Sequence, residues 1–269
     1  MKRSRILIYG VLGASLLLWI VPFYILGAVS VNADMLARPP EWFPSQPSIV
    51  GYEAYFYRSG FGRWVLNSFI YSISITAGSV AISVLAGYAF SRLQFRGKTV
   101  LFWLVLIGMM MPAIVYYIPL FITMARLQLV DTYAGMILPL LVNPFSVFLV
   151  KQAFDGVPRD FEEAAVVDGA SPYQIMFSVM LPLVRPVMIT VLLFNFIWSW
   201  NNWIWPLFVL SNNSLFNLPI AVWLQSNTFT IIFQNVAAGG VLAAIVPLIL
   251  YIIALDYFMK GVVLTGLKG

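Results

Sequence analysis

The 269-residue sequence contains no cysteine and no histidine. Without cysteine there are no disulfides or zinc–thiolate sites, and without histidine the usual neutral-pH general base and the commonest metal ligand are missing. Hydrolytic triads and histidine-based metal motifs have no residues from which to form, so we expect no catalytic residue and no metal site. Charged residues are scarce as well, at 9% of the chain. This scarcity argues against a water-soluble domain, which needs far more polar surface.

Hydrophobic residues make up 61% of the chain, and they gather in long runs. A membrane-spanning helix consumes about 20 residues, so a chain of this length accommodates about six spans in one bundle. Six runs are long enough, at residues 6–31, 64–90, 100–125, 133–154, 184–210 and 240–259. The sequence therefore predicts an all-α integral membrane protein in which residues 1–269 form a single transmembrane domain.

The first apolar run follows three basic residues and so begins like a signal peptide. It is longer than the roughly 7 to 15 apolar residues of a signal sequence, which favours a retained spanning helix. Small residues at Ala28 and Ser30 leave cleavage as the alternative. A polar, proline-rich segment from Asn32 to Gly62 follows and is predicted to be an exposed loop.

The lysine and arginine residues predict the orientation in the membrane. If the N-terminus lies in the cytoplasm, four arginines fall outside, namely Arg38, Arg58, Arg63 and Arg126. The cytoplasmic basic residues are then Lys2, Arg3, Arg5, Arg92, Arg96, Lys98, Lys151, Arg159, Arg185, Lys260 and Lys268. The positive-inside rule therefore places both termini in the cytoplasm, which agrees with the parity of six spans. It also explains the net charge of +5 without nucleic-acid binding.

Between the fourth and fifth predicted spans lies a charged loop, residues 155–183. Its charged residues are Asp155, Arg159, Asp160, Glu162, Glu163 and Asp168. Burying one charge at mid-bilayer costs roughly 3 kcal/mol even on the lenient insertion scale. We therefore expect this loop to lie in water or against a protein partner.

Within this loop the sequence predicts a helix, a turn and a second helix. Asp160 is an N-cap candidate with Glu163 three residues later, the pattern of a capping box, and Gly169 suits a left-handed position at the helix end. Ser171–Pro172 offers a second N-cap with proline at the first helical position, and Pro182 is expected to mark the next break. The apolar residues predicted to form a docking face between the acids are Phe161, Ala164, Ala165 and Ile175.

The loop resembles the cytoplasmic signature of permease subunits from binding-protein-dependent ABC importers. That signature reads Glu-Ala-Ala, three residues, Gly, nine residues, Ile, one residue and Leu-Pro. The chain matches it at Glu163–Ala165, Gly169 and Leu181–Pro182, with Val179 as a volume-conservative replacement of Ile. An ordinary amphipathic loop helix is the alternative. The resemblance implies the type I ABC importer permease fold.

In that family the loop docks in a cleft of the ATP-binding subunit, and the resemblance implies that Glu163 faces basic groups there. The resemblance therefore implies an ATPase-coupling role for Glu162, Glu163, Ala164, Ala165, Asp168, Gly169, Leu181 and Pro182. It also implies that ATP and Mg²⁺ are bound by the ATPase partner and that this chain binds no cofactor. The Gly97–Thr99 stretch does not contradict this, because a phosphate-binding loop needs a glycine where Arg92 stands.

Four further segments resemble the carbohydrate branch of the family, in particular the smaller maltose-type permeases. They are Asn67–Ser68, Gly87–Arg92 followed by Arg96–Lys98, Trp200–Asn201 followed by Trp205–Leu207, and Leu264–Gly269. This resemblance implies uptake of a sugar or oligosaccharide, with glycerol-3-phosphate or a polyol as the alternative. It also implies a second ATPase contact at Thr265, Gly266 and Lys268, to which a frayed, inert terminus is the alternative.

The same resemblance implies the partners of the chain. They are a homologous larger permease, two ATP-binding subunits, an extracytoplasmic solute-binding protein and membrane lipid, in the cytoplasmic membrane of a bacterium or archaeon. A stand-alone secondary carrier or channel is the competing class of transporter. Such proteins couple through ionisable groups inside the membrane, and none lies clearly at mid-span in this sequence.

The fifth predicted span carries the residues expected to line the translocation pathway. Trp198, Asn201, Asn202 and Trp205 stand at i, i+3, i+4 and i+7 and would share one face of a continuous helix. Aromatic faces flanked by amides suit a sugar, whose ring stacks on indole and whose hydroxyls take hydrogen bonds. An aromatic belt at the membrane interface with an interhelical amide bond is the alternative.

The second and third predicted spans carry signals for packing and bending. Met109–Pro112 and Pro119 are expected to break or kink the third span near the pathway, and filling of the core by the methionines is the alternative. The small residues expected to allow close packing of the second span are Ser68, Ser72, Ser79 and Ser83.

Overall fold

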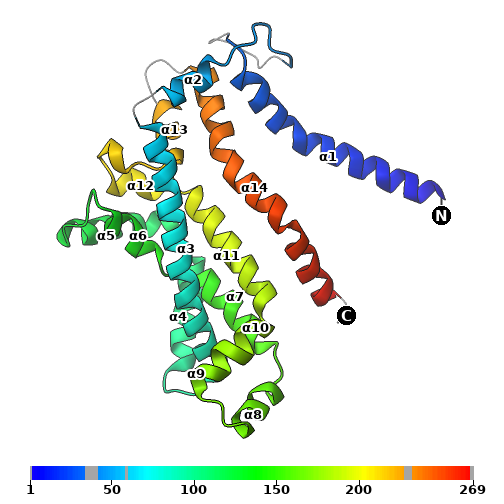
Figure 1. Ribbon diagram of the computed structural model, residues 1–269, viewed down its shortest axis with the longest axis vertical. Coiled ribbons are helices and arrows are strands. Elements are labelled where there is room, and N and C mark those ends of the chain that lie inside the picture. Colours follow the sequence, from blue (N-terminus) through cyan, green and yellow to red (C-terminus); the bar gives the residue numbers. More distant parts are fainter. Residues whose placement is uncertain (1, 34–41, 58–59, 227–231, 267–269) are drawn as a thin grey trace.

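The computed structural model describes residues 2–33, 42–57, 60–226 and 232–266. Within these ranges the regular structure is helical, apart from one isolated antiparallel bridge between Asn32 and Pro47. The prediction of an all-α protein is confirmed for this part of the chain. Figure 1 shows an elongated bundle, with the N-terminal helix splayed to one side.

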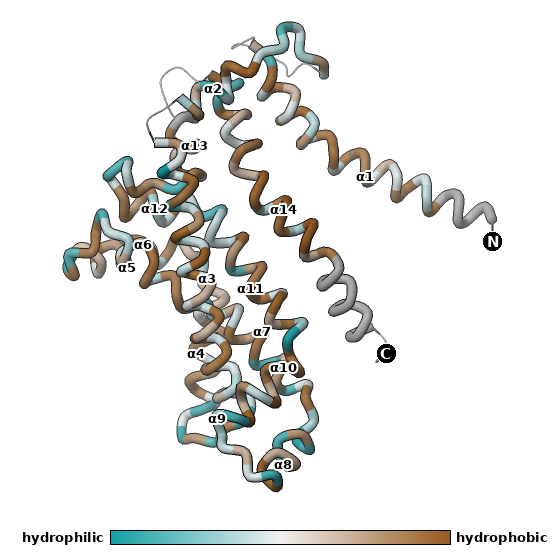
Figure 2. Tube along the Cα trace, viewed as in Figure 1, coloured by the Kyte–Doolittle hydropathy of each residue, from teal (hydrophilic) through white to brown (hydrophobic). Residues whose placement is uncertain are grey.

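Three helices are long and apolar enough to cross a membrane unaided: α1 (Lys2–Ser30), α3 (Phe61–Arg92) and α14 (Phe233–Gly266). α1 packs against α14, yet its apolar window contains no buried residue. Figure 2 shows hydrophobic residues along both of these helices. An exposed helix that is apolar on all sides needs lipid or a partner subunit around it.

The central helix of the bundle is α3, which packs against α7 (Pro144–Asp155) and α11 (Arg185–Trp200). Four of its serines are buried, as the sequence predicted for close helix packing: Ser68, Ser72, Ser79 and Ser83. Gly87 makes a similar approach possible near the end of α3, because a Cβ there would lie 2.7 Å from Val150 Cγ1. Small side chains thus bring the backbones of α3 and α7 together.

Three further helix pairs have the composition of a membrane span but bend sharply at a break. In the first, α4 (Lys98–Met110) and α5 (Ala113–Arg126) meet at 105°. Pro112 explains this break, since a proline disfavours helical backbone in the residue before it, and Met111 is extended at φ −75° and ψ 126°. The predicted break is therefore present, whereas Pro119 lies inside α5.

The second bent pair joins α6 (Tyr133–Ile137) and the short 3₁₀ helix η1 (Leu138–Leu140) to α7, with a bend of 41°. Asn143 caps α7, because its Oδ1 accepts hydrogen bonds from the backbone N–H groups of Phe145 at 3.0 Å and Ser146 at 3.3 Å. An asparagine in this position satisfies amides that have no partner within the helix. The cap thus fixes where α7 begins.

The third bent pair contains α9 (Pro172–Gln174), the π-helical η2 (Ile175–Met180) and α10 (Leu181–Leu183), which together meet α11 at 82°. The break lies at Val184, and the expectation of a break at Pro182 is wrong. Proline is tolerated in the first turn of a helix, where its missing N–H has no partner in any case. Pro182 therefore lies in the first turn of α10 instead of ending the helical stretch.

Short helices occupy the end of the molecule that carries α2 (Val50–Phe56), which lies inside the segment predicted as a loop. α11 stops at Trp200, and α12 (Ile204–Val209), η3 (Asn213–Leu215) and α13 (Leu218–Ser226) follow. The continuous fifth helix that the sequence predicted is therefore interrupted.

The first turns of α3 hold this end of the molecule together. Trp64 Nε1 donates a hydrogen bond to Asn213 Oδ1 at 2.9 Å. Asn67 Nδ2 donates to the carbonyl oxygens of Ser214 and Phe216, both at 2.9 Å. Since the last turn of α3 lies near the charged loop, this one helix connects the two ends of the bundle (Figure 1).

Candidate functional site

The charged loop forms a short helix, α8 (Asp160–Val167), at the end of the molecule opposite α2 (Figure 1). Ala165 is its buried residue and packs in a cluster that includes Phe154 of α7 and Met180 of η2. This cluster anchors the loop to the bundle. The exposed residues of the helix are available to a partner.

The exposed residues of α8 differ in part from the docking face predicted from the sequence. Phe161 and Ala164 are exposed as expected, but Ala165 and Ile175 are buried and anchor the loop instead. Val167, which was not predicted, is 86% exposed. We call the exposed residues of this helix the α8 surface: Asp160, Phe161, Glu163, Ala164, Val166 and Val167.

The N-terminal end of α8 lacks the predicted capping box. Arg159 occupies the N-cap position and makes no side-chain cap hydrogen bond, while Asp160 is already the first helical residue. The prediction is wrong because the chain enters the helix one residue earlier than the sequence pattern suggested. Asp160, Glu162 and Glu163 instead place three acids in the first turn, where the helix dipole favours negative charge.

The C-terminal end of α8 is the turn that the sequence predicted. Gly169 has φ +80°, the left-handed conformation that glycine adopts without steric cost. Its N–H donates to Val166 O at 3.0 Å, and the Ala170 N–H donates to Ala165 O at 2.9 Å, which is the Schellman pattern. The following helix also starts as predicted.

Ser171 forms a capping box with Gln174 at the start of this second helix. The Ser171 N–H donates to Gln174 Oε1 at 2.8 Å, and the Gln174 N–H donates to Ser171 Oγ at 3.4 Å. Pro172 occupies the first helical position, as expected. The two caps hold a rigid corner between α8 and α9.

The two adjacent glutamates of the signature lie in different surroundings. Glu163 is exposed, whereas the Glu162 side chain is 19% exposed and places Oε1 3.2 Å from Nε of Arg92. This is an ion-pair contact without the alignment of a hydrogen bond. Of the other signature residues, Asp168 and Pro182 are exposed and Leu181 is partly buried. Glu163 is thus open to a partner, and Glu162 is directed into the protein.

The structure separates the four residues predicted to share one face of the fifth span. Trp198 is 41% exposed and Asn201 is exposed, directly after the end of α11. Asn202 is buried, and its Oδ1 accepts from the Trp205 N–H at 3.1 Å. Trp205 is fully buried, with Nε1 donating to Gly135 O at 3.2 Å. The prediction of a single face is wrong because the helix ends at Trp200.

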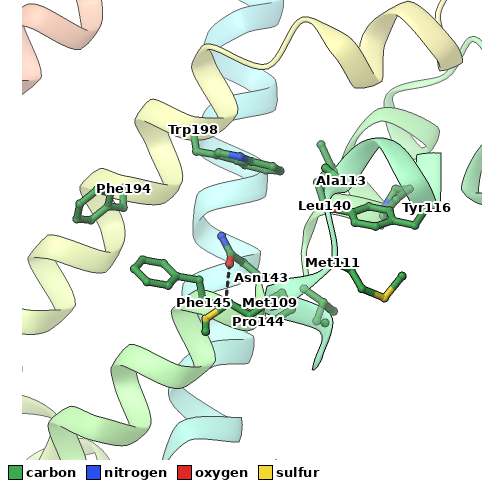
Figure 3. Close-up of a pocket in the computed structure, with 13 residues that line it drawn as sticks. Met109, Met111, Ala113, Tyr116, Leu140, Asn143, Pro144, Phe145, Phe194 and Trp198 are labelled. Carbon is green, nitrogen blue, oxygen red and sulfur yellow. Dashed lines mark hydrogen bonds between the residues drawn. The ribbon is translucent and has the colours of Figure 1, made fainter. Parts of the chain in front are cut away.

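Trp198 lies at two adjoining pockets. One, of about 450 Å³, also includes Asn201 and Tyr117 in its lining. The other, of about 460 Å³, also includes Asn143 and Phe194. Figure 3 shows the indole of Trp198 extending from α11 across this second pocket. Neither pocket is lined by a lysine or an arginine, so both present aromatic faces and amides without positive charge.

A buried amide, Asn195, joins three helices behind the second pocket. Its Nδ2 donates to Ser146 Oγ at 2.7 Å and to Val191 O at 2.8 Å. Its Oδ1 accepts from Ser79 Oγ and from Asn143 Nδ2, both at 3.1 Å. Asn143 was not among the predicted site residues, although asparagine before proline at the start of an apolar run is an N-cap signal.

The tail residues predicted to contact the ATPase are only partly covered by the structure. Thr265 and Gly266 end α14, and Lys268 lies outside the described residues. Among the residues that the structure places, no group of three or more acidic side chains could hold a metal ion.

An α-helical bundle with membrane-spanning helices, lateral pockets and an exposed acidic helix at one end has the architecture of a membrane transport subunit. The family model described as "Binding-protein-dependent transport system inner membrane component" matches residues 79–263, and the chain belongs to this family. The resemblance to ABC importer permeases is therefore confirmed. The chain is a multi-pass inner-membrane component of such an importer.

Relatives of known function show the same type of protein. The arabinooligosaccharides transport system permease protein AraQ of Bacillus subtilis is 31% identical over 94% of this chain and 92% of its own length. The sn-glycerol-3-phosphate transport system permease protein UgpE of Pectobacterium atrosepticum is 31% identical over 76% of this chain and 73% of its own length. Both relatives are permease subunits.

The fold is also found in a solved structure. A chain of a bacterial ABC transporter involved in the import of the acidic polysaccharide alginate superimposes with a TM-score of 0.84. The match covers 96% of this chain and 97% of that chain at 23% identity. The overall fold of this chain is therefore one found in a bacterial ABC transporter.

Proposed function

We propose that this chain is the smaller permease subunit of an ATP-driven importer of a sugar or oligosaccharide. Its partners are a homologous larger permease, two ATP-binding subunits and an extracytoplasmic solute-binding protein, in the cytoplasmic membrane of a bacterium or archaeon. ATP and Mg²⁺ are bound by the ATPase subunits, and this chain carries no cofactor. The observation behind the proposal is the α8 surface, which presents acids and apolar side chains away from the bundle.

In this function α8 receives the motion of the ATPase. Closure of the two ATPase subunits around ATP displaces the cleft in which the α8 surface sits, and Ala165 conveys the displacement to α7 and η2 because it is buried between them. The two permeases then rock between inward-open and outward-open states. Thr265, Gly266 and Lys268 form a second contact with the ATPase.

The proposed topology has six spans with both termini in the cytoplasm. Three single helices and three bent pairs supply the six by length and composition. The basic residues near the span ends support the orientation. α8 then lies on the cytoplasmic side, where an ATPase can bind it.

The pockets favour a neutral sugar as the solute. Trp198 offers an indole face for stacking and Asn201 offers an amide for hydroxyl groups, while the buried Asn202 and Trp205 hold this wall in place. A phosphate ester would need charge-assisted donors such as arginine, and neither pocket contains one. The UgpE relative makes sn-glycerol-3-phosphate the second candidate.

Solute-stimulated ATPase activity of the reconstituted complex tests the substrate class. Arabinotriose, maltose and sn-glycerol-3-phosphate would each be added with the cognate binding protein, and ATP hydrolysis compared with a solute-free control. One of the two sugars is expected to stimulate hydrolysis. Stimulation by sn-glycerol-3-phosphate alone would exclude the sugar assignment.

Reversal of the charge at Glu163 tests the ATPase contact. Glu163→Lys places a like charge against the basic groups implied for the cleft, which can cost several kcal/mol at an interface. The variant is expected to insert normally but to retain less ATPase on purification. Glu53→Lys is the matched control, because Glu53 is exposed on α2 at the opposite end. An acidic substitution in the cleft should partly restore binding, and undiminished binding by Glu163→Lys would refute the contact.

A further inference from the structure

Arg92, the last residue of α3, lies buried at the junction of three segments. Its side chain is 6% exposed, and Nη2 donates hydrogen bonds to the carbonyl oxygens of Phe154 and Val157. Phe154 belongs to α7 and Val157 to the linker before α8, while Nε lies 3.2 Å from Oε1 of Glu162 on α8. One guanidinium group therefore contacts α7, the linker and α8.

The inner side of α8 has two attachments to the bundle that differ in kind. Glu162 and Ala165 stand three residues apart and so share one face of the helix. Ala165 packs among apolar side chains, a contact without directional bonds. Glu162 meets the guanidinium of Arg92, whose planar fork of donors has a fixed geometry. The directed hydrogen bonds of the guanidinium run to the carbonyl oxygens of Phe154 and Val157, so Arg92 positions the chain just before α8, and the charge of Glu162 holds the helix against it.

Stability alone does not account for this buried pair. Desolvation of two charges offsets most of their attraction, and apolar residues of similar size often replace a buried ion pair without loss of stability. Apolar side chains at positions 92 and 162, however, could not bind the carbonyl groups of Phe154 and Val157. The guanidinium thus ties two backbone segments, the end of α7 and the linker before α8, to the end of α3.

Through α3, Arg92 is connected to the opposite end of the bundle. The helix has 32 residues, which corresponds to about 48 Å at 1.5 Å per residue. Its first turns bind the 213–216 segment through Trp64 and Asn67. A displacement at Arg92 therefore reaches the opposite end of the bundle through one continuous helix.

We propose that Arg92 is a positioning residue that transmits the displacement of α8 to α3 and α7. Glu162 is its partner within the chain and takes no part in the ATPase contact that the resemblance implied for it. The proposal rests on the proposed function, because it requires an ATPase that moves α8.

The test is the number of solute molecules transported per ATP hydrolysed in vesicles containing the whole complex. The solute is whichever of arabinotriose, maltose and sn-glycerol-3-phosphate stimulates the wild-type ATPase. The main variant is Arg92→Met combined with Glu162→Met, which leaves no unpaired buried charge. We expect it to bind the ATPase normally, with transport per ATP lowered roughly 5-fold or more, the lower end of typical coupling between sites.

Arg92→Lys is the companion variant, since it keeps the charge but lacks the planar fork. Its transport per ATP is expected to lie between the values of the wild type and the double variant. If the double variant fails to reach the membrane, Arg92→Lys by itself tests the role of Arg92. Wild-type transport per ATP in either variant would show that the pair only compensates buried charge, and would overturn the proposal. Loss of bound ATPase from the double variant would also overturn the proposal, because it would show that Glu162 takes part in the ATPase contact. Failure of the proposed function is distinguishable, because Glu163→Lys would then retain the ATPase.

Discussion

At the scale of single residues, neighbours of the same type have different roles because a helix turns by about 100° per residue. Glu162 pairs with Arg92, whereas Glu163 is exposed. Trp198 is 41% exposed at the pockets, whereas Trp200 is 1% exposed in the interior. Residue type suggested which chemistry is available, and the orientation of each side chain determines where that chemistry acts.

Gly169 allows a test of backbone conformation free of steric effects. An added Cβ there would meet no atom within 4 Å, so the penalty of substitution comes from φ +80° alone. The left-handed conformation costs an ordinary residue roughly 1–2 kcal/mol and is especially unfavourable for a β-branched one, whereas asparagine tolerates it. Gly169→Val is expected to abolish uptake, and Gly169→Asn to preserve much of it. Equal uptake by the two variants would contradict this role.

Trp198 and Trp205 are expected to give opposite results when replaced by alanine. Trp205 is fully buried, so its removal should destabilise the fold by about 3–5 kcal/mol. Trp198 borders the pockets, and its removal should leave the melting temperature nearly unchanged while weakening solute-stimulated ATPase activity. Thermal unfolding and a solute titration measure the two effects. If Trp198→Ala shows the wild-type dependence of ATPase activity on solute concentration, Trp198 serves only in helix packing.

At the scale of elements, apolar runs predicted which parts of the chain are helical better than where each helix bends or stops. The 100–125 run bends by 105° at Met111–Pro112, and the 184–210 run stops at Trp200 before α12 begins. Proline explains the first break from local sequence. The second is secured by contacts distant in sequence, because Asn217 Nδ2 donates to Asn202 O at 2.9 Å.

The C-terminal end of α7 is expected to make stability depend on pH. Partial burial acts to raise the pKa of Asp155, but hydrogen bonds from Lys151 and Ser91 hold the pKa below its ordinary value of 3.8. The folded state therefore favours the carboxylate. Its contribution is complete above about pH 5 and is lost as the pH falls from there through the lowered pKa.

Thermal unfolding of the solubilised protein between about pH 5 and pH 3 measures this contribution. The wild type should lose more stability than Asp155→Asn, which lacks the titrating group. The Asp155 side chain is 37% exposed, so solvent screening limits the difference to under about 1 kcal/mol. If the stability of the two proteins depends on pH in the same way, the Asp155 carboxylate does not stabilise the folded state.

At the scale of the whole molecule, α8 and α2 mark opposite ends of the bundle (Figure 1). The proposed function requires the ATPase contact and the surface for the binding protein to lie on different sides of the membrane. The arrangement is therefore compatible with transport across the bilayer, and the positive charges near the span ends indicate which end is cytoplasmic.

Reporter fusions test this orientation directly. Fusions after Ser48 and after Asn213 should report the external side, because they lie near the end that carries α2. Fusions after Gly97 and after Gly169 should report the cytoplasm. A cytoplasmic signal after Ser48 would reverse the proposed orientation.

The sequence by itself determined the membrane class, the family and the corner at Gly169 and Ser171. Hydropathy and charge follow from the composition of each segment, and helix caps depend on residues only a few positions apart. These features can therefore be predicted without knowledge of the tertiary structure. Only the tertiary structure decided that Ala165 anchors the loop, that Glu162 faces Arg92 and that Trp205 is buried against Gly135. Each of these depends on a partner distant in sequence, and a helical repeat does not specify which neighbour will cover a given face.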